Sequence, residues 1–262
     1  MWQDNFIELD DLRLHYWRTG SGRPVVMLHG VSDNGRCWGR TGDALAQEFD
    51  VILVDQRAHG QSSAPETGYL LDDYASDVYG LIKALNLSDL ILVGHSLGAS
   101  VSLRTASKYP DLISRVVLID PPMPDSPQNT DPDERYEWFG WLRNFQTQSI
   151  EELIEHHTTP NWSENEIRAM AESKHQVRPV LWSEHGTTLD TYWRDEMRKV
   201  GDMPALLIYG ELERGSAVSP ENVHEAMSIL QNGKAVHIKN AGHIVHLDQF
   251  EATIATILTF LR

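Results

Sequence analysis

The run from Gly94 to Gly98 reads Gly-His-Ser-Leu-Gly and places Ser96 two residues from a glycine on each side. The apolar residues before it, 90–93, predict a buried strand, and a helix is predicted from residue 97 onward. A chain that turns this abruptly from strand to helix strains its central residue. Glycines lack the β-carbons that would clash where the two elements cross. The pattern therefore predicts that Ser96 is a nucleophile whose hydroxyl stands above the edge of a sheet.

The candidate base for this serine is His243, because a hydroxyl is a weak nucleophile until a base removes its proton. His243 lies in a turn that follows the last predicted strand. A loop at the strand ends brings an imidazole within reach of a serine on such a turn. His246 is the nearest alternative. His95 is held by the turn around Ser96, and we expect it to shape the substrate pocket rather than to transfer protons.

Three carboxylates could orient this base, since a catalytic triad needs an acid that fixes the imidazole in one tautomer. Glu211 and Glu213 follow a predicted strand at 205–209, and Asp120 follows another at 116–119. All three agree with the chain order serine, acid, histidine. We predict Glu213, which lies deeper in its loop, with Asp120 and Glu211 as alternatives. A carboxylate that caps the following proline turn is an equal interpretation of Asp120.

Backbone N–H groups are the expected donors to the oxyanion that forms on an attacked carbonyl. Leu97, the residue after the nucleophile, supplies one donor at the start of a helix. The second is expected from Val31, after the strand at 25–28, where Gly30 permits a close approach to the substrate. Trp38, further along the chain, is predicted to line the substrate pocket, with burial in the core as the alternative.

Apolar runs of strand length alternate with stretches of helical periodicity along most of the chain. Strands are predicted at 6–9, 12–17, 25–28, 51–54, 90–93, 116–119, 205–209 and 235–238. Helices are predicted at 43–48, 74–85, 97–108, 220–230 and 249–261. Short, wholly apolar strands alternating with helices are typical of parallel sheets buried on both faces. The sequence therefore predicts an α/β fold with a mostly parallel, doubly wound sheet, which begins with a hairpin at 10–11.

Residues 122–202 interrupt this pattern with a stretch rich in tryptophan. Helices are predicted within it at 136–145, 151–157, 164–175 and 188–199. Trp138 and Trp141 fall on one face of the first of these helices, and we expect them to contact substrate. The chain is thus predicted to have a core of residues 1–121 and 203–262, with 122–202 inserted as a helical cap, or lid, over an apolar pocket.

Composition restricts the partners and the compartment. The 262 residues carry a formal net charge of −16, which would repel nucleic acids and anionic membranes, so neither is expected as a partner. Cys37 is the only cysteine, so no intrachain disulfide can form. The N-terminal residues do not resemble a signal peptide, and no run of residues has the length of a membrane span. We expect a cytoplasmic protein that acts on a small ester-like molecule, and a homodimer is compatible with the sequence.

A metal site is not expected, although histidines are abundant. Glu152 and His156 lie one helical turn apart with His157 beside them, but no second cluster completes a coordination shell. The three are interpreted as a solvated helix face.

Several of these motifs together resemble those of the α/β-hydrolase superfamily, in the order in which that family has them. They lie at 29–30, 94–98, 210–213 and 240–243, together with the polar loop at 55–62 that follows the predicted strand 51–54. The resemblance covers almost the whole chain, with 122–202 in the place of the family's lid. It implies Ser96 as nucleophile, His243 as base, Leu97 and Val31 as oxyanion donors, and no cofactor.

The same resemblance leaves the acid open. Many relatives have aspartate where this chain has Glu213, and some use a carboxylate at the position of Asp120. Serine at position 96, rather than aspartate, argues against the epoxide hydrolase and haloalkane dehalogenase branches.

The sequence thus predicts an enzyme, a serine hydrolase of carboxylesterase type that cleaves esters of small to medium apolar substrates through an acyl-enzyme. A lactonase or a carbon–carbon hydrolase with the same triad is an alternative, because fold does not determine substrate. A ligand-binding or signalling protein with slow turnover is a hypothesis of another class. Serine-dependent turnover would favour the enzyme, and ligand binding that survives Ser96→Ala would favour the receptor.

Overall fold

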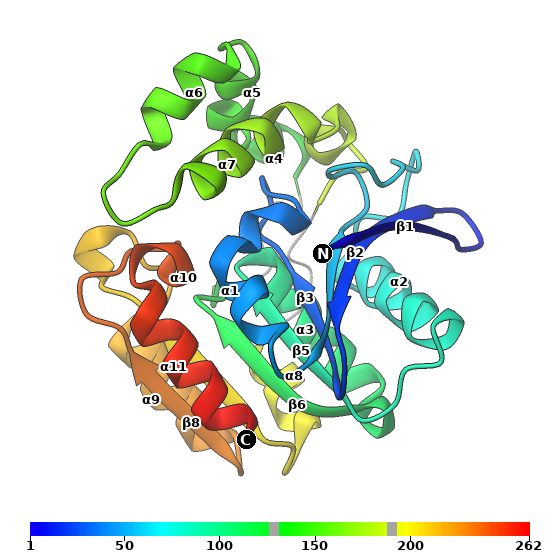
Figure 1. Ribbon diagram of the computed structural model, residues 1–262, viewed down its shortest axis with the longest axis vertical. Helices are drawn as coiled ribbons and strands as arrows, with labels where there is room; N and C mark the ends of the chain where they lie inside the picture. Colours follow the sequence, from blue (N-terminus) through cyan, green and yellow to red (C-terminus); the bar gives the residue numbers. More distant parts are fainter. Residues whose placement is uncertain (126–130, 188–192) are drawn as a thin grey trace.

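The computed structural model describes residues 1–125, 131–187 and 193–262. Its strands are β1 (Gln3–Glu8), β2 (Arg13–Gly20), β3 (Pro24–Leu28), β4 (Asp50–Asp55), β5 (Leu90–His95), β6 (Ile113–Ile119), β7 (Ala205–Tyr209) and β8 (Gly233–His237). Within the described residues these eight strands form one sheet in the order β1-β2-β4-β3-β5-β6-β7-β8 (Figure 1). Strand β2 is antiparallel to both of its neighbours, and the pairings from β4 to β8 are parallel. The predicted hairpin and mostly parallel sheet are confirmed.

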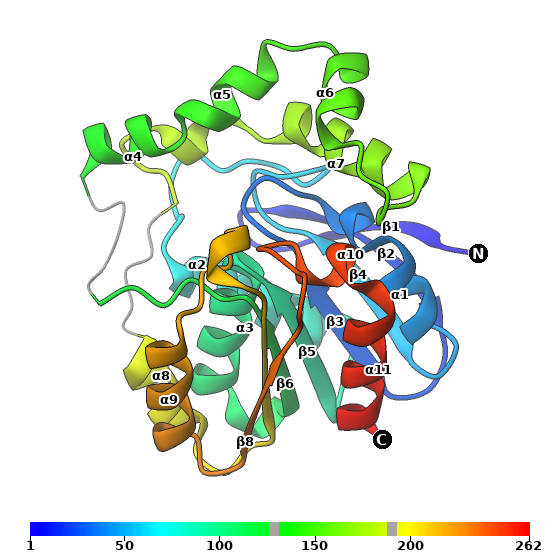
Figure 2. The ribbon, with the colours of Figure 1, turned by 90° about the vertical axis from the view of Figure 1, so that its left-hand side faces the viewer.

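Helices cover both faces of this sheet (Figure 2). One face packs against α2 (Leu71–Ala84), α3 (Leu97–Lys108), α8 (Trp193–Val200) and α9 (Pro220–Ile229). The other packs against α1 (Gly39–Leu45), α10 (Val245–Asp248) and α11 (Phe250–Leu261). Short 3-10 helices are η1 (Gly35–Trp38), η2 (Pro110–Leu112), η3 (Pro179–Trp182) and η4 (Leu212–Arg214).

The central strands are apolar throughout because each face of the sheet has its own core. In β3, Val26 and Leu28 join the core beneath α2 and α3, whereas Val25 and Met27 join the core beneath α1 and α11. Successive side chains of a strand point to opposite faces, so two covered faces require an unbroken apolar run. This is the physical reason why the strands could be recognised from sequence.

Four helices between β6 and β7 lie over one end of the sheet, and we call them the cap (Figure 2). They are α4 (Pro132–Trp138), α5 (Gly140–Gln146), α6 (Ile150–His157) and α7 (Glu164–Gln176). Helix α8, which also falls in the predicted insert 122–202, packs instead against α3 and α9. It therefore belongs to the layer of helices on the sheet, and we propose that the cap proper is α4–α7.

Some predicted helices differ from those observed. The predicted helix 136–145 is two helices, α4 and α5. The helical path is interrupted at Phe139, which is buried and has φ of −81° and ψ of 5°, and α5 starts at Gly140. The predicted helix 43–48 lies earlier, as α1, and α10 was not predicted. Part of the predicted helix 188–199, namely 188–192, lies outside the described residues. Glu152, interpreted as solvated surface, completes a capping box with Ser149 at the start of α6.

None of the helices in the three described ranges is both long enough and apolar enough to cross a membrane.

A charge cluster around the buried His15 ties the first hairpin to the rest of the sheet. His15 of β2 lies with Nδ1 2.7 Å from Asp55 Oδ2 and Nε2 2.9 Å from Asp4 Oδ1. Burial lowers the pKa of His15, but hydrogen bonds and charges from Asp55 and Asp4 outweigh it, and the pKa is raised above its ordinary value of 6.5. The imidazolium can donate to both carboxylates at once.

We expect His15 to contribute most to stability at low to neutral pH and to lose this contribution in base. The folded chain holds the proton more tightly than the unfolded chain does. The contribution is therefore complete below the ordinary pKa and is lost as pH rises through the raised one. Urea unfolding of wild type and His15→Gln should differ by about 1–3 kcal/mol at about pH 6. The difference should shrink towards about pH 9, and a difference that grows over this interval would contradict the expectation.

Candidate active site

Ser96 lies at the turn between β5 and α3 with φ of 51° and ψ of −119°, a backbone conformation that residues other than glycine rarely adopt. A β-carbon on Gly94 would lie 2.1 Å from the carbonyl oxygen of Gly98. One on Gly98 would lie 1.9 Å from the carbonyl oxygen of Leu28 in β3. The strained turn and the close crossing predicted from the two glycines are confirmed.

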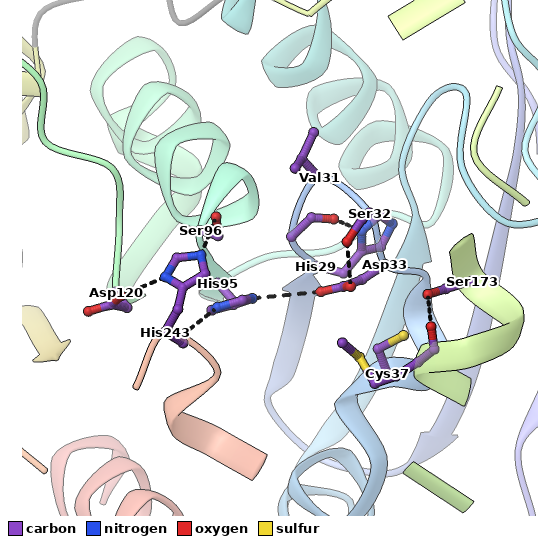
Figure 3. A network of polar contacts seen from close by, with 12 residues as sticks. His29, Val31, Ser32, Asp33, Cys37, His95, Ser96, Asp120, Ser173 and His243 are labelled. Carbon is purple, nitrogen blue, oxygen red and sulfur yellow. Dashed lines mark hydrogen bonds and ion pairs between the residues drawn. The ribbon is translucent and has the colours of Figure 1, made fainter. Parts of the chain in front are cut away.

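Three side chains meet beyond the ends of β5 and β6 (Figure 3). His243 Nε2 lies 3.0 Å from Ser96 Oγ, and His243 Nδ1 lies 2.6 Å from Asp120 Oδ2. In the paired strands His95 is opposite Ile119, so the residues that follow them share one edge of the sheet. His243 comes from the loop between β8 and α10. A carboxylate in this position can hold Nδ1–H and leave Nε2 to accept the serine proton.

Asp120 is completely buried and has φ of 44° directly after β6. The loop after β7 supplies it with two donors. Ser216 Oγ–H donates to Oδ1 at 2.5 Å, and the Ala217 N–H donates to Oδ2 at 2.7 Å. The Val218 N–H donates to Ser216 Oγ at 3.3 Å, so this oxygen is an acceptor there while its proton points to the carboxylate. These contacts fix the orientation of the carboxylate that faces His243.

The prediction that Glu213 holds His243 is wrong, because Asp120 makes that contact. Glu213 lies in η4 and is exposed to solvent. Glu211, the third candidate, accepts the Asn240 N–H at 3.0 Å and pairs with Arg214. The 3-10 turn directs the chain outward at Glu213 and returns it to the interior at Ser216.

We expect Ser216→Ala to lower kcat by about tenfold or more with little change in KM, since a hydrogen bond to a charged group is worth about 1.5–3 kcal/mol. Ser216→Thr, which keeps the hydroxyl, should recover most of the loss. Ser219→Ala is the matched control, because Ser219 caps α9 and has no contact with Asp120 among the described residues. It should lower the midpoint of thermal unfolding and leave kcat unchanged. Equal losses of kcat in Ser216→Ala and Ser219→Ala would indicate only general destabilisation.

The peptide between Gly30 and Val31 is held at its carbonyl end. His29 Nδ1–H donates to Gly30 O at 2.7 Å, because His29 Nε2 accepts the Gln56 N–H at 3.1 Å and therefore carries no proton. Burial lowers the pKa of His29, which favours this neutral form. His59 Nε2 lies 2.6 Å from Val31 O. A trans peptide directs N–H opposite to C=O, so the contact of His29 orients the Val31 N–H predicted as an oxyanion donor, and the contact of His59 holds the next peptide.

Leu97, the other predicted donor, is the first residue of α3. The N–H groups of a helix's first turn have no acceptor within the helix, and the positive end of the helix dipole favours a developing negative charge there. Its role, like that of Val31, stays a prediction.

His95 lies below the triad and contacts it through the backbone. Its Nε2–H donates to the carbonyl oxygen of His243 at 2.9 Å. Burial, followed by the charges of His243 and His246, lowers the pKa of His95 to about 3. A neutral ring in this place supports the loop that carries the base, in agreement with the expectation that His95 shapes the pocket.

Two other candidates lie away from the reacting atoms. His246 is buried against Trp38, with ring centroids 4.7 Å apart, and burial lowers its pKa to about 4. Trp38 is only 1% exposed and packs in the core beneath α1 and α11. It is not among the residues that line the cavity above Ser96, so the prediction that it lines the substrate pocket is wrong.

A cavity of about 410 Å³ lies between Ser96 and the cap. Its floor includes the predicted residues Gly30, Val31, His95 and His243. Its roof includes the predicted Trp138 and Trp141, which are 45% and 40% exposed. Further roof residues, not singled out as substrate contacts from the sequence, are Phe145, His157, Trp162, Met170 and Lys174. The roof is therefore mostly aromatic, as the tryptophan content of the insert predicted.

A buried ion pair joins the cap to the loop after β3. Lys174 Nζ of α7 lies 3.0 Å from Asp33 Oδ1 and 2.9 Å from Ser32 Oγ, and both partners follow Val31 in the chain. Burial opposes ionisation of Asp33, but Lys174 and nearby histidines outweigh it and hold the pKa of this carboxyl well below its usual range. Asn34 Nδ2 also donates to Gln176 Oε1 at 2.8 Å. The end of α7 is thus fastened to the predicted oxyanion loop.

No sequence motif marks Asp33, Lys174 or Ser216, the residues near the site that the sequence did not predict. Asp33 and Lys174 are 141 positions apart, and only the folded chain brings them together. Ser216 lies three residues beyond Glu213, in a loop where the carboxylates alone suggest a catalytic role. Across residues 1–125, 131–187 and 193–262, no group of three or more His, Cys, Asp or Glu side chains is arranged to hold a metal ion.

Comparison with known proteins places these observations in a family. The sequence pattern of the family described as alpha/beta hydrolase fold matches residues 23–250. A 2-(acetamidomethylene)succinate hydrolase of Mesorhizobium japonicum is 44% identical over 114 residues, which are 44% of this chain and only 41% of that protein. An N-formylmaleamate deformylase of Pseudomonas putida is 24% identical over 258 residues, covering 97% of this chain and 95% of that protein.

The fold agrees with these matches over the full length. The crystal structure of E-2-(acetamidomethylene)succinate hydrolase superimposes with a TM-score of 0.85 at 28% identity, covering 100% of this chain and 99% of that one.

Proposed function

Because this chain is a hydrolase that belongs to the α/β hydrolase-fold family, we propose that it cleaves carboxylic esters through a covalent acyl-enzyme on Ser96. The observation that carries this proposal is the chain of contacts from Ser96 Oγ through His243 to Asp120, at 3.0 Å and 2.6 Å. A serine connected in this way to an imidazole and a carboxylate is activated for attack on an acyl carbon.

The reaction follows from these positions in two stages. Ser96 Oγ attacks the acyl carbon while His243 Nε2 takes its proton, and the N–H groups of Leu97 and Val31 stabilise the oxyanion. His243 then gives the proton to the leaving oxygen, and the alcohol departs. A water molecule, deprotonated by His243, attacks the acyl-enzyme and releases the acid with Ser96 restored. Asp120 stays ionised and stabilises the imidazolium in both stages.

The aromatic roof supports a substrate with a largely apolar body. Trp138, Trp141 and Trp162 present wide apolar ring surfaces above the serine. A cavity of about 410 Å³ can enclose a small to medium substrate.

A second candidate is hydrolysis of N-acyl compounds by the same groups. It is favoured by the names of two relatives, a 2-(acetamidomethylene)succinate hydrolase and an N-formylmaleamate deformylase. Matched acyl esters and acyl amides of one acid, assayed side by side, separate the two candidates through the ratio of their kcat/KM values.

A fluorophosphonate probe tests the proposal directly, because it reacts only with an activated serine. We expect one probe per chain, attached at Ser96 in the peptide map, and parallel loss of p-nitrophenyl ester hydrolysis. Ser96→Ala should bind no probe, while Ser100→Ala, one turn further along α3, should be labelled normally. If the folded wild type is not labelled, or is labelled elsewhere, the proposal fails.

A further inference from the structure

Asp248, the last residue of α10, joins the cap to the loop that carries the catalytic base. Its Oδ2 accepts the N–H of Gly242 at 2.8 Å, and its Oδ1 accepts the indole Nε1–H of Trp162 at 3.0 Å. Gly242 directly precedes His243, and Trp162 lies in the cap just before α7. Asp248 is not among the residues that line the cavity, so its contacts concern the position of other residues rather than the substrate.

The backbone is held on both sides of His243. On one side, the carbonyl oxygen of Ala241 accepts the Glu211 N–H at 2.8 Å, and the N–H of the same peptide is the one that Asp248 accepts. On the other side, the carbonyl oxygen of His243 accepts His95 Nε2–H at 2.9 Å. Two fixed peptides restrict where the imidazole can lie. Asp248 supplies one of these contacts from a side chain that also bonds the cap.

Trp162 is itself fixed by its surroundings. Its ring stacks on that of His157 with an interplanar angle of 17°. Arg40 of α1 holds the chain on either side of it, because Nη2 donates to the carbonyl oxygen of Asn161 at 2.8 Å and Nε donates to the Glu166 carboxylate at 3.1 Å. The indole N–H is therefore presented to Asp248 from a rigid position.

The two bonds to Asp248 depend on each other. The side chain is half-buried, so a carboxylate that lost its contact with Trp162 could rotate towards water and release Gly242. The peptide before His243 would then be held at its carbonyl end alone. Displacement of a base by a fraction of an ångström is costly, because proton transfer requires the imidazole within hydrogen-bonding distance of the serine.

We propose that Asp248 and Trp162 are positioning residues for the catalytic base. The indole holds the carboxylate, the carboxylate holds the peptide before His243, and the imidazole is thereby kept 3.0 Å from Ser96 Oγ. The cap then helps to place the base in addition to roofing the cavity. This inference rests on the proposed hydrolysis at Ser96 and concerns how the base is held rather than which bond is cleaved.

The test is a double-mutant cycle of Trp162→Phe and Asp248→Ala, with kcat for p-nitrophenyl ester hydrolysis as the readout. Phenylalanine keeps an aromatic ring beside His157 and removes only the N–H donor. We expect Trp162→Phe to lower kcat about fivefold and Asp248→Ala about tenfold, as the loss of hydrogen bonds to a charged group predicts. Asp248→Asn, which keeps one acceptor oxygen, should lie between wild type and Asp248→Ala.

The coupling between the two substitutions is decisive, because Trp162 also lines the cavity and its replacement can change KM. In the Asp248→Ala background, Trp162→Phe should lower kcat by less than about twofold, since the contact that it breaks is already absent. An equal fall of kcat in both backgrounds would overturn the inference, since the indole would then act through its ring alone. Wild-type kcat in Trp162→Phe would overturn it as well.

Trp2→Phe is the matched control. Trp2 Nε1–H donates to Asp43 Oδ1 at 2.7 Å, a bond of the same kind, and neither residue is among those that line the cavity. This variant should keep the kcat of wild type. A fall equal to that of Trp162→Phe would overturn the inference, because the loss would then reflect general destabilisation.

Hydrogen exchange of the Gly242 amide, followed by NMR, tests the inference without turnover. We expect Trp162→Phe to speed this exchange about fivefold and Trp2→Phe to leave it unchanged. An unchanged rate in Trp162→Phe would refute the role of the indole even where ester hydrolysis at Ser96 is confirmed. If no ester is hydrolysed, the proposed function fails, and faster exchange would still support the link from the cap to the base loop. The comparison needs no variant of Asp248, so it holds also if Asp248→Ala does not fold.

Discussion

Ser96→Ala is expected to lower kcat for ester hydrolysis about a hundred-thousandfold, and His243→Ala to lower it nearly as far. The two side chains act as one unit, because the serine needs the imidazole to lose its proton, and without the serine no acyl-enzyme forms for the imidazole and water to hydrolyse. The double variant should therefore be no slower than either single variant, to within about threefold. The rate that remains comes from the oxyanion donors and from binding alone.

Steady-state rates at saturating substrate, corrected for the uncatalysed reaction, measure this effect. Circular dichroism must show that each variant is folded, since Ser96 occupies a strained conformation that alanine also has to adopt. Additive losses in the double variant would mean that the two residues act in separate steps. Retention of more than about one per cent of kcat in Ser96→Ala would place the nucleophile elsewhere.

Asp120→Asn is expected to lower kcat about ten-thousandfold, whereas Glu213→Gln should leave it within about twofold of wild type. An amide at position 120 has no negative charge with which to stabilise the imidazolium. Its single oxygen also cannot accept at both carboxylate positions, where Ser216, Ala217 and His243 now donate. Asp120 is also buried with its oxygens bonded to Ser216 and Ala217, so no other carboxylate can replace it. Glu213 is exposed and has none of these contacts.

The pair of substitutions is well matched, because each changes one carboxylate to its amide on a strand-end loop of the same sheet edge. Both kcat and fluorophosphonate labelling rates should follow the same ranking. The reverse ranking would return the role to Glu213 and would require the loop after β7 to rearrange.

The sheet and the nucleophile could be predicted because short-range physics determines them. Strands buried on both faces must be largely apolar, as β3 is, and as β5 is from Leu90 to Val93. At Ser96 the constraint is steric, since a β-carbon at either flanking glycine would overlap a carbonyl oxygen. Such constraints act within a few residues and are visible in one sequence.

The acid was predicted wrongly because all three candidates, Glu211, Glu213 and Asp120, satisfy chain order and loop position. What separates Asp120 from Glu213 is the path of the backbone, namely a left-handed residue after β6 and a 3-10 turn after β7. Neither is determined by a local pattern of residue types. Trp38 was misjudged for a related reason, since an indole near a site packs into the core or faces the ligand according to long-range packing.

The aromatic composition of the cap could be predicted, but the contacts of its individual residues could not. Its aromatic composition indicated an apolar roof, and Trp138 and Trp141 do line the cavity. The partners of Lys174 depend on how α7 packs against the loop after β3, which no sequence periodicity determines.

The ion pair between Lys174 and Asp33 has a consequence for how substrates reach Ser96. Movement of α7 away from this loop would break a buried contact between opposite charges. The ion pair therefore opposes opening of the cap on the α7 side. Trp138 and Trp141 also line the cavity and are 45% and 40% exposed, so a substrate that enters beside them would meet aromatic ring surface before it reaches Ser96. Its shape would then be selected before any bond is broken.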